Sequence, residues 1–186
     1  MLDFEKAFDT VEWSFLFKTL EKFNFGPQFI KWMKLLYESP CAKVKNNGWL
    51  SDKITLKRGI RQGCPVSALL FIIIVEILAL IIKQSPHKGI VVQIGEQIRE
   101  MKLSQYADDT CLFLKDETQI ALVLKIIKSF GIFAGPKLNL KKTEGIWPAA
   151  KNIALINHSS GNIKFPSDPV RCLGIYLGTN RKNVNA

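Results

Sequence analysis

The chain has 186 residues, of which 47% are hydrophobic, so it is long enough for one domain with a core and short for two. Lys and Arg number 26 against 16 Asp and Glu, and the formal net charge of +10 points to an anionic partner such as nucleic acid or a membrane surface. The alternative is that the charge serves solubility alone. Four widely spaced cysteines form no C-x-x-C pair, which argues against a zinc site or a disulfide framework and indicates reduced thiols of an intracellular protein.

The first half of the sequence predicts a strand end, two helices and a hairpin, in that order. Residues 1–4 are typical of a strand end, and apolar residues then recur at helical spacing between residues 15 and 23. Gly26-Pro27 ends this helix and begins a second one that runs to about residue 37. The segment "CAKVKNNGWLSDKITLKRG" predicts two short strands about an Asn-Asn-Gly turn.

The stretch "VSALLFIIIVEILALII", from Val66 to Ile82, is the one segment that raises the question of a membrane. It is shorter than the roughly 20 apolar residues that a spanning helix requires, and inserting Glu76 in its middle would cost about 2.5 kcal/mol or more. We therefore expect a helix buried in the protein core. Because the opening "MLDFEKAFD" lacks a signal pattern, the sequence predicts a protein of the nucleus or cytoplasm that is not secreted and binds no membrane.

The second half of the sequence predicts two hairpins and another helix. "IVVQIGEQI" forms a hairpin on Gly95-Glu96, and "MKLSQYADDTCLFL" forms a second one. Asp116 is a suitable N-cap for a helix over residues 117–133. From Gly135 onward, short apolar runs broken by Gly, Pro, Asn and Ser predict loops and edge strands. Strands mixed with helices in this way indicate an α+β fold.

Two adjacent aspartates, Asp108 and Asp109, lie between the apolar runs of the second hairpin. At a hairpin tip both carboxylates can approach one spot, where they repel unless one is protonated or cations lie between them. Mg²⁺ prefers a few carboxylates plus phosphate oxygens, so a two-metal site needs a third carboxylate from elsewhere. Asp3 is the candidate, because a first strand beside the hairpin would place all three on one edge. A solvated turn is the alternative interpretation.

The segments "LDFEKAFDTVEW", "RGIRQGCPVSALLF", "YADD", "GPKLNLKKTE" and "CLGIYLG" follow one another along the chain. In this order they resemble the palm motifs of reverse transcriptases, most closely those of non-LTR (LINE-type) retrotransposons. The resemblance implies a partial reverse transcriptase palm domain over residues 1–186, an antiparallel sheet packed on helices with fingers and thumb largely missing. Because nothing in the chain precedes its first strand, we expect that strand to be weakly anchored.

The resemblance further implies an RNA-directed DNA polymerase that works on an RNA template, a DNA primer and a deoxynucleoside triphosphate (dNTP). Asp3, Asp108 and Asp109 would hold two Mg²⁺ ions, one lowering the pKa of the primer 3′-hydroxyl and the other neutralising the leaving pyrophosphate. Two alternatives stay open: a catalytically inactive nucleic-acid-binding remnant of a truncated retrotransposon reading frame, and another metal-dependent nucleotidyl transferase or nuclease. The longer polyprotein that would carry fingers and thumb is a further expected partner.

Further roles follow from the resemblance, each beside a purely structural alternative. Phe8 would lie beneath the sugar and exclude a 2′-hydroxyl, although it can equally be a core residue. Gln62 and Gly63 would contact the incoming nucleotide, against an ordinary turn before a helix. Lys142 would protonate the pyrophosphate, with Lys141 as the alternative register and a plain surface lysine as the structural alternative.

Other site residues are implied in the same way. Tyr106 and Ala107 would lie under the primer terminus and nucleotide, although Tyr106 can equally serve packing. For both Arg58 and Arg61, the sequence supports phosphate contact and a solvated surface position equally. The segment "CLGIYLG" resembles the hairpin that grips the primer, but Cys172 stands where the family usually has an aromatic residue, which puts stacking there in doubt.

The segment from residue 43 to residue 61 is strongly basic. It contains six Lys and Arg but only one acidic residue, Asp52. Such a stretch would bind a phosphate backbone without sequence preference, and solvated hairpin faces are the even alternative. Trp49 within it can stack on a base, but we expect it to pack in the core.

Overall fold

The computed structural model describes residues 1–146, 163–166, 170–172 and 175–177. Its helices are α1 (Trp13–Lys22), α2 (Pro27–Leu36), α3 (Pro65–Gln84) and α4 (Ile120–Ala134), with short 3-10 helices η1 (Phe8–Thr10) and η2 (Glu117–Gln119). Its strands are β1 (Phe4–Glu5), β2 (Cys41–Ala42), β3 (Lys45–Asn46), β4 (Trp49–Leu50), β5 (Ile54–Thr55), β6 (Ile90–Ile94), β7 (Gln97–Met101), β8 (Leu103–Tyr106), β9 (Asp109–Leu112), β10 (Lys137–Leu138), β11 (Val170–Cys172) and β12 (Ile175–Leu177).

The strands pair two by two, and every pair is antiparallel. The pairs are β1–β10, β2–β5, β3–β4, β6–β7, β8–β9 and β11–β12. Helices combined with antiparallel strands confirm the predicted mixture of the two elements. Within the described ranges the strands do not merge into the one extended sheet that a palm implies, so the palm arrangement stays a prediction.

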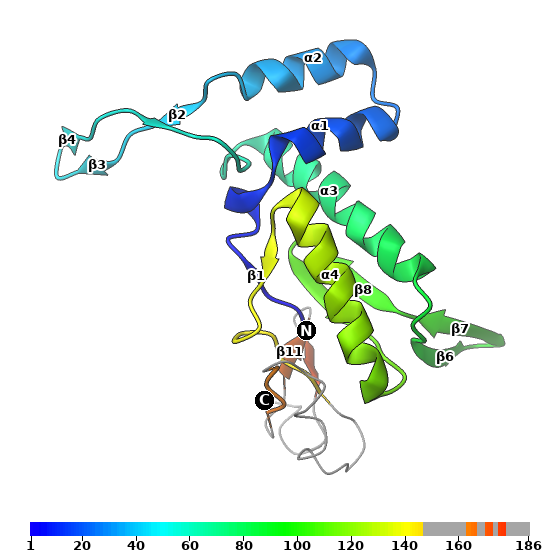
Figure 1. The fold of residues 1–186 in the computed structure, drawn as a ribbon. Coiled ribbons are helices and arrows are strands. Elements are labelled where there is room, and N and C mark those ends of the chain that lie inside the picture. The colour runs from blue at the N-terminus through cyan, green and yellow to red at the C-terminus, as the bar shows by residue number, and fades with distance from the viewer. Residues whose placement is uncertain (147–162, 167–169, 173–174, 178–186) are drawn as a thin grey trace.

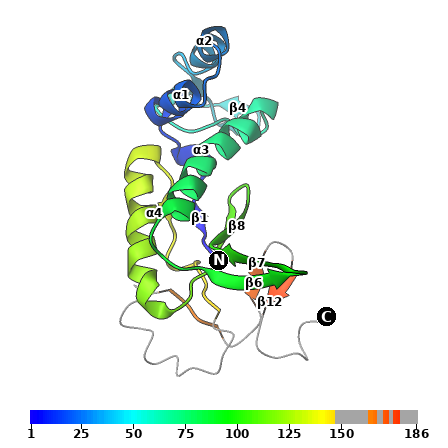
Figure 2. The same ribbon diagram turned by 90° about the vertical axis from the view of Figure 1, so that its right-hand side faces the viewer.

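Helix α3 forms the centre of the core, and α1, α4 and β8 pack against it. Figures 1 and 2 show α3 and α4 side by side, with α1 and α2 stacked at one end of the pair. The length and composition of α3 would also allow it to span a membrane. One face of α3 is nevertheless buried in the protein, as expected for a core helix, through Leu70, Phe71, Ile74, Leu78 and Ile82.

Local sequence signals place the element ends where they were expected. Pro65 occupies the first turn of α3, and Pro27 occupies that of α2. The Asp116 carboxylate accepts a hydrogen bond from the backbone N–H of Thr118 at 3.1 Å, so the predicted N-cap is confirmed. The first turn after this cap is the 3-10 helix η2, and the α-helix proper begins only at Ile120.

The first strand is held on both sides. The backbone N–H of Leu2 donates to the carbonyl of Thr110 at 2.8 Å, and the N–H of Asn139 donates to the carbonyl of Asp3 at 2.8 Å. Directly afterwards β1 pairs with β10, with Phe4 opposite Leu138. The first segment therefore lies between β9 and β10, and the expectation of weak anchoring is wrong.

Residues 41–57, which we name the arm, project away from the helices (Figure 1). Strands β3 and β4 meet at the predicted turn, where Asn47 and Gly48 have φ of +48° and +90°. Every residue of the arm is exposed. Trp49 has 82% of its surface exposed, so the expectation that it packs in the core is wrong.

The cysteines do not share one state. Cys41 and Cys64 are free thiols. Cys111, which is buried in β9, is disulfide-bonded, so the expectation of reduced thiols is wrong for this residue.

Candidate active site

The segments that carry Asp3 and Asp109 lie side by side through strand pairing. Leu2 and Thr110 form an antiparallel bridge, and both side chains are buried, with 6% and 0% of their surface exposed. Residues directly opposite in such a pair share a face, and neighbours along a strand alternate between faces. The bridge is isolated, and if its register continued by one residue Asp3 would lie opposite Asp109 on the face that points away from the core.

Asp108 lies next to this pair, in the loop of the β8–β9 hairpin. Tyr106 pairs with Asp109, which leaves Ala107 and Asp108 as a two-residue loop. Ala107 has φ of +52°, in the left-handed region that two-residue hairpin loops require and that favours glycine. Tyr106 has 77% of its surface exposed, so it does not serve packing in this structure.

The three carboxylates have the ligand chemistry that Mg²⁺ prefers, although they do not converge. In the described part of the chain, none of Asp3, Asp108 and Asp109 forms an ion pair or accepts a hydrogen bond through its carboxylate. Oxygen ligands without a protein partner on one edge fit a hard cation. No three Asp, Glu, His or Cys side chains of the described residues lie close enough to hold one ion, so the fit rests on residue type and register.

The segment that carries Lys142 borders Asp3 on its other side. The backbone N–H of Asp3 donates to the hydroxyl of Thr143 at 3.3 Å, and that hydroxyl donates to the carbonyl of Asn139 at 2.9 Å. Thr143 is buried, with 2% of its surface exposed. This contact holds the turn of residues 139–143 against the backbone of Asp3, and Lys142 in that turn is exposed.

The loop of residues 58–64 docks on η1 through its backbone. Gly59 N–H donates to the carbonyl of Val11 at 2.8 Å, and Ile60 N–H donates to the carbonyl of Phe8 at 2.8 Å. Gly59 has φ of +94°, and a Cβ there would lie 2.7 Å from the carbonyl oxygen of Asp9. Only glycine allows this approach, so the loop and the segment after β1 form one unit.

Side chains of the same loop reinforce the contact. Gln62 Nε2 donates to Asp9 Oδ1 at 3.2 Å, and Arg58 forms an ion pair with Glu12 at 3.5 Å. Gly63 has φ of +82°, and Arg61 is exposed. The structure therefore shows a second, structural use for Gln62 and Arg58, while Gly63 and Arg61 stay open to solvent or ligand.

Phe8 lies at the border between this unit and the core. Its ring stacks on that of Phe71 in α3, with centroids 4.3 Å apart and planes 18° from parallel. The side chain is only partly buried. Phe8 is thus fixed by a core residue while part of its surface stays accessible, which accommodates both readings of the sequence.

A cavity of about 500 Å³ lies between the docked loop and α2, and its walls include Trp13, Tyr37, Cys64 and Ser67. Burial raises the pKa of the Tyr37 hydroxyl. The backbone N–H of Val66 lowers the pKa of the Cys64 thiol at the start of α3, because it hydrogen-bonds the thiolate. Both residues border the loop expected to meet the nucleotide.

Sequence reasoning missed the residues that position the site. Trp13 Nε1 donates to the carbonyl of Gly59 at 2.8 Å, and the buried Thr110 accepts from Gln105 Nε2 at 3.0 Å. Glycine directly after Arg58 in a loop was a visible signal for a close backbone approach. Thr143 gave no signal, because its partner Asp3 lies 140 residues away in the chain.

Comparison with known proteins assigns the chain to a family. The family model for "Reverse transcriptase (RNA-dependent DNA polymerase)" matches residues 1–177, and the chain therefore belongs to the reverse transcriptase family. Among its relatives is the "Transposon TX1 uncharacterized 149 kDa protein" of Xenopus laevis, which is 31% identical over 99% of this chain and 14% of its own length.

Two further relatives come from insects. The "Retrovirus-related Pol polyprotein from type-2 retrotransposable element R2DM" of Drosophila melanogaster is 27% identical, over 99% of this chain and 18% of the relative. The "Retrovirus-related Pol polyprotein from type-1 retrotransposable element R2" of Popillia japonica is 29% identical, over 80% of this chain and 20% of the relative. The chain thus spans no more than a fifth of these retrotransposon relatives.

Proposed function

We propose that the chain is the palm of an RNA-directed DNA polymerase and transfers a nucleotide from a dNTP to a primer 3′-hydroxyl on an RNA template. The observation that carries the proposal is the bridge between Leu2 and Thr110, which brings the segment of Asp3 beside the hairpin that carries Asp108 and Asp109. Membership of the reverse transcriptase family supports the same reaction. In agreement with such partners, we also propose that the protein acts in the nucleus or cytoplasm.

The three aspartates would hold the metal ions, since their carboxylates have no protein partner in the described residues. Two Mg²⁺ ions, when bound, would activate the primer hydroxyl and neutralise the leaving pyrophosphate. Phe8, fixed against Phe71, would exclude a 2′-hydroxyl from the sugar position. Lys142, on the segment tied to Asp3, would donate a proton to the pyrophosphate.

The docked loop and the hairpin would position the substrates. Gly63 would let the backbone approach the incoming nucleotide, and Gln62 would exchange its bond with Asp9 for a bond to the sugar. Tyr106 and Ala107 would lie under the primer terminus. Arg61 would contact phosphate, and Arg58 would do so only by leaving Glu12.

A second candidate function is a nucleic-acid-binding remnant without catalysis. The observation in its favour is that the acidic side chains of the described residues do not converge into a three-ligand group. The two functions differ in one measurable property. A polymerase binds divalent ions at the acidic edge and extends a primer, whereas a remnant binds nucleic acid without either.

The test compares Asp108→Asn with wild type and with Glu96→Gln. Glu96 is the matched control, because it is the second residue of the two-residue turn between β6 and β7, as Asp108 is between β8 and β9. Mn²⁺ binding, followed by electron paramagnetic resonance, and Mg²⁺-dependent primer extension are measured for all three proteins.

We expect Asp108→Asn to lose the bound Mn²⁺ and to reduce any extension at least about 100-fold, while Glu96→Gln matches wild type. Extension by wild type is expected to be slow, because positioning supplies most of the catalysis of phosphoryl transfer and the chain spans at most 20% of its matched relatives. Equal Mn²⁺ binding by all three proteins would remove the hairpin from the site. Nucleic-acid binding without Mn²⁺ binding would establish the remnant instead.

A further inference from the structure

The arm exposes apolar side chains that nothing in the described structure covers. Val44, Trp49, Leu50 and Ile54 have 58%, 82%, 61% and 48% of their surface exposed. An isolated two-stranded hairpin is marginally stable in water, and exposed apolar surface of this kind typically marks a binding site. The arm is therefore a candidate binding surface.

The charge of the arm identifies the chemistry of that occupant. The arm contains a single acidic residue, Asp52, and four lysines: Lys43, Lys45, Lys53 and Lys57. All five side chains are exposed. In the described part of the chain, none of the four lysines forms an ion pair with a carboxylate. A net excess of three positive charges around an exposed indole matches a polyanion with accessible aromatic faces.

We propose that the arm binds single-stranded nucleic acid, with Trp49 stacked on an unpaired base and the four lysines against the phosphates. A duplex buries the faces of its bases, so only an unpaired base offers a face to an indole. The inference rests on the proposed function, and it assigns to the arm the unpaired part of the template strand.

The arm is attached where such a strand would arrive. Strand β5 ends at Thr55, and the chain reaches Gly59 within four residues, a distance of at most about 14 Å. Gly59 belongs to the loop that docks on η1 beside Phe8. A template that pairs with an incoming nucleotide at this loop would extend along the lysines of the arm.

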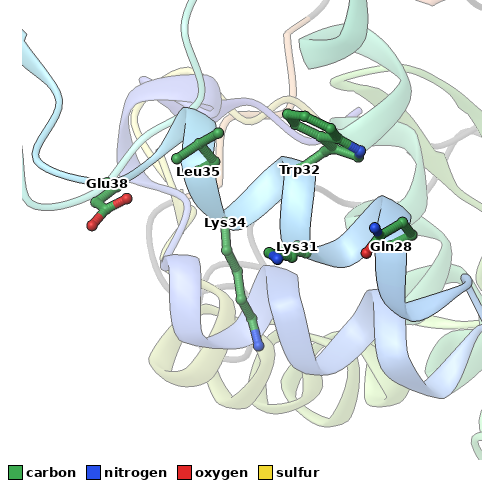
Figure 3. A pocket seen from close by; sticks show the side chains of 6 residues that line it. All are labelled: Gln28, Lys31, Trp32, Lys34, Leu35 and Glu38. Carbon is green, nitrogen blue, oxygen red and sulfur yellow. The ribbon is translucent and has the colours of Figure 1, made fainter.

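Helix α2 offers an instructive contrast, shown in Figure 3. Trp32 has 61% of its surface exposed, and a hollow of about 540 Å³ lies on its helix face. The nearby Lys34 points instead toward α1, where it pairs with Glu21 at 3.4 Å. Lys34 is paired with Glu21, and the charge of Lys31, which also lines the hollow, is offset by that of Glu38, so α2 lacks the net charge excess of the arm. Trp32 is therefore a matched control for Trp49.

The first experiment measures the affinity of the full chain for fluorescently labelled oligonucleotides by anisotropy, without dNTP or divalent ions. The ligands are a single-stranded RNA and a blunt duplex of the same sequence. Stacking of one base corresponds to about 5-fold to 150-fold in affinity, so Trp49→Ala should weaken binding to the single strand by that factor. Trp49→Phe should retain most of the affinity, and Trp32→Ala should match wild type.

The second experiment follows the salt dependence of the same binding. Each phosphate contact contributes about 0.7 to the slope of log affinity against log salt for a single strand. Replacing Lys45 and Lys53 by Gln should therefore reduce the slope by about 1.4. The control replaces Lys125 and Lys128, two exposed lysines of α4, and should leave the slope unchanged.

The outcomes separate this inference from the proposed function. An unchanged affinity and slope in the arm variants would overturn the inference and assign the arm to a protein partner. An equal loss on the single strand and the blunt duplex would also overturn it, because stacking on an unpaired base would then be excluded. Mn²⁺ binding that depends on Asp108 tests the polymerase proposal alone and is unaffected by either result.

Discussion

The helical body and the arm are built on different principles. In the body, α3 and α4 bury a continuous core, and Leu78 and Ile127 have at most 1% of their surface exposed. In the arm, the backbone pairs Cys41 with Thr55 and Asn46 with Trp49, while every side chain stays exposed. Apolar packing therefore determines the body and hydrogen-bond register determines the arm. The same kind of substitution should therefore change stability by very different amounts in the two regions.

The largest expected difference concerns aromatic side chains. Phe71 has 1% of its surface exposed and stacks on Phe8, so Phe71→Ala should lower the free energy of unfolding by about 3–5 kcal/mol. Trp49→Ala, which removes a larger ring from the arm, should change it by no more than about 0.5 kcal/mol. Urea denaturation followed by circular dichroism measures both. Comparable losses would show that the arm packs against the body in solution.

A smaller effect is expected at two glycines that share a conformation but not an environment. Gly59, where the arm joins the body, has φ of +94°, and Gly48, at the tip of the arm, has φ of +90°. A Cβ at Gly59 would lie 2.7 Å from the Asp9 carbonyl oxygen, whereas a Cβ at Gly48 would have no atom of the described residues within 4 Å. Gly59→Ala should therefore destabilise the protein by about 1–3 kcal/mol more than Gly48→Ala.

The measurement for this pair is again the free energy of unfolding. Both substitutions introduce the same backbone strain, so the difference between their destabilisations reports the clash with the Asp9 carbonyl oxygen. Gly59→Ala should also lower the affinity for a dNTP, because it displaces the loop that carries Gln62. Equal destabilisation by the two substitutions would show that the loop does not dock on η1 as described.

The smallest effect concerns pH, to which the body responds through a buried histidine that the arm lacks. His87 has 1% of its surface exposed, and its Nε2 has no hydrogen-bond partner among the residues that the structure describes. Burial lowers the pKa of His87, and the charge of Lys102 lowers it further, while Glu100 opposes the shift. The unfolded chain therefore binds a proton more readily below the ordinary pKa of about 6.5.

The free energy of unfolding should consequently fall as the pH drops below about 6.5, by at most about 1.4 kcal/mol per pH unit, until the folded-state pKa is reached. Melting curves between pH 5.5 and pH 8 measure this loss. In His87→Gln, which cannot titrate, the dependence over the same window should be weaker. An equal dependence in both proteins would assign it to other groups.

Local features of this chain were predictable from the sequence alone. The Asn47-Gly48 turn, the Gly95-Glu96 turn and the N-cap at Asp116 each depend on a few neighbouring residues, and all three form as expected. The mixture of helices and antiparallel strands follows from the same signals. These elements are predictable because the energy that determines them lies within a short window of sequence.

Contacts between distant segments were not predictable in the same way. Trp49 was expected in the core, because an aromatic residue in a short strand usually packs, but within the described ranges no second layer covers the arm. The weak anchoring expected for the first strand also proved wrong, since Thr110 and Asn139 hydrogen-bond it from both sides. Neither outcome follows from a local pattern, because each depends on which segments meet in space.

The candidate site likewise combines features that the sequence predicted with contacts that it did not. The residue types at Asp3, Asp108 and Asp109 indicated an acidic edge, and the structure places their segments side by side. The internal bonds of Gln62 and Arg58 were not foreseen, because their partners Asp9 and Glu12 could be identified only from the docked loop.

The position of the first strand has a consequence for the order in which regions of the protein can form during synthesis. Asp3 is held by Thr143, 140 residues later, and synthesis at about 5–20 residues per second needs about 7–30 s to supply that partner. The two outer strands of the arm, in contrast, pair Cys41 with Thr55, residues only 14 apart in the chain. During synthesis both strands of the arm are therefore available well before Thr143 can bind Asp3, so the acidic edge is the later of the two regions to be completed.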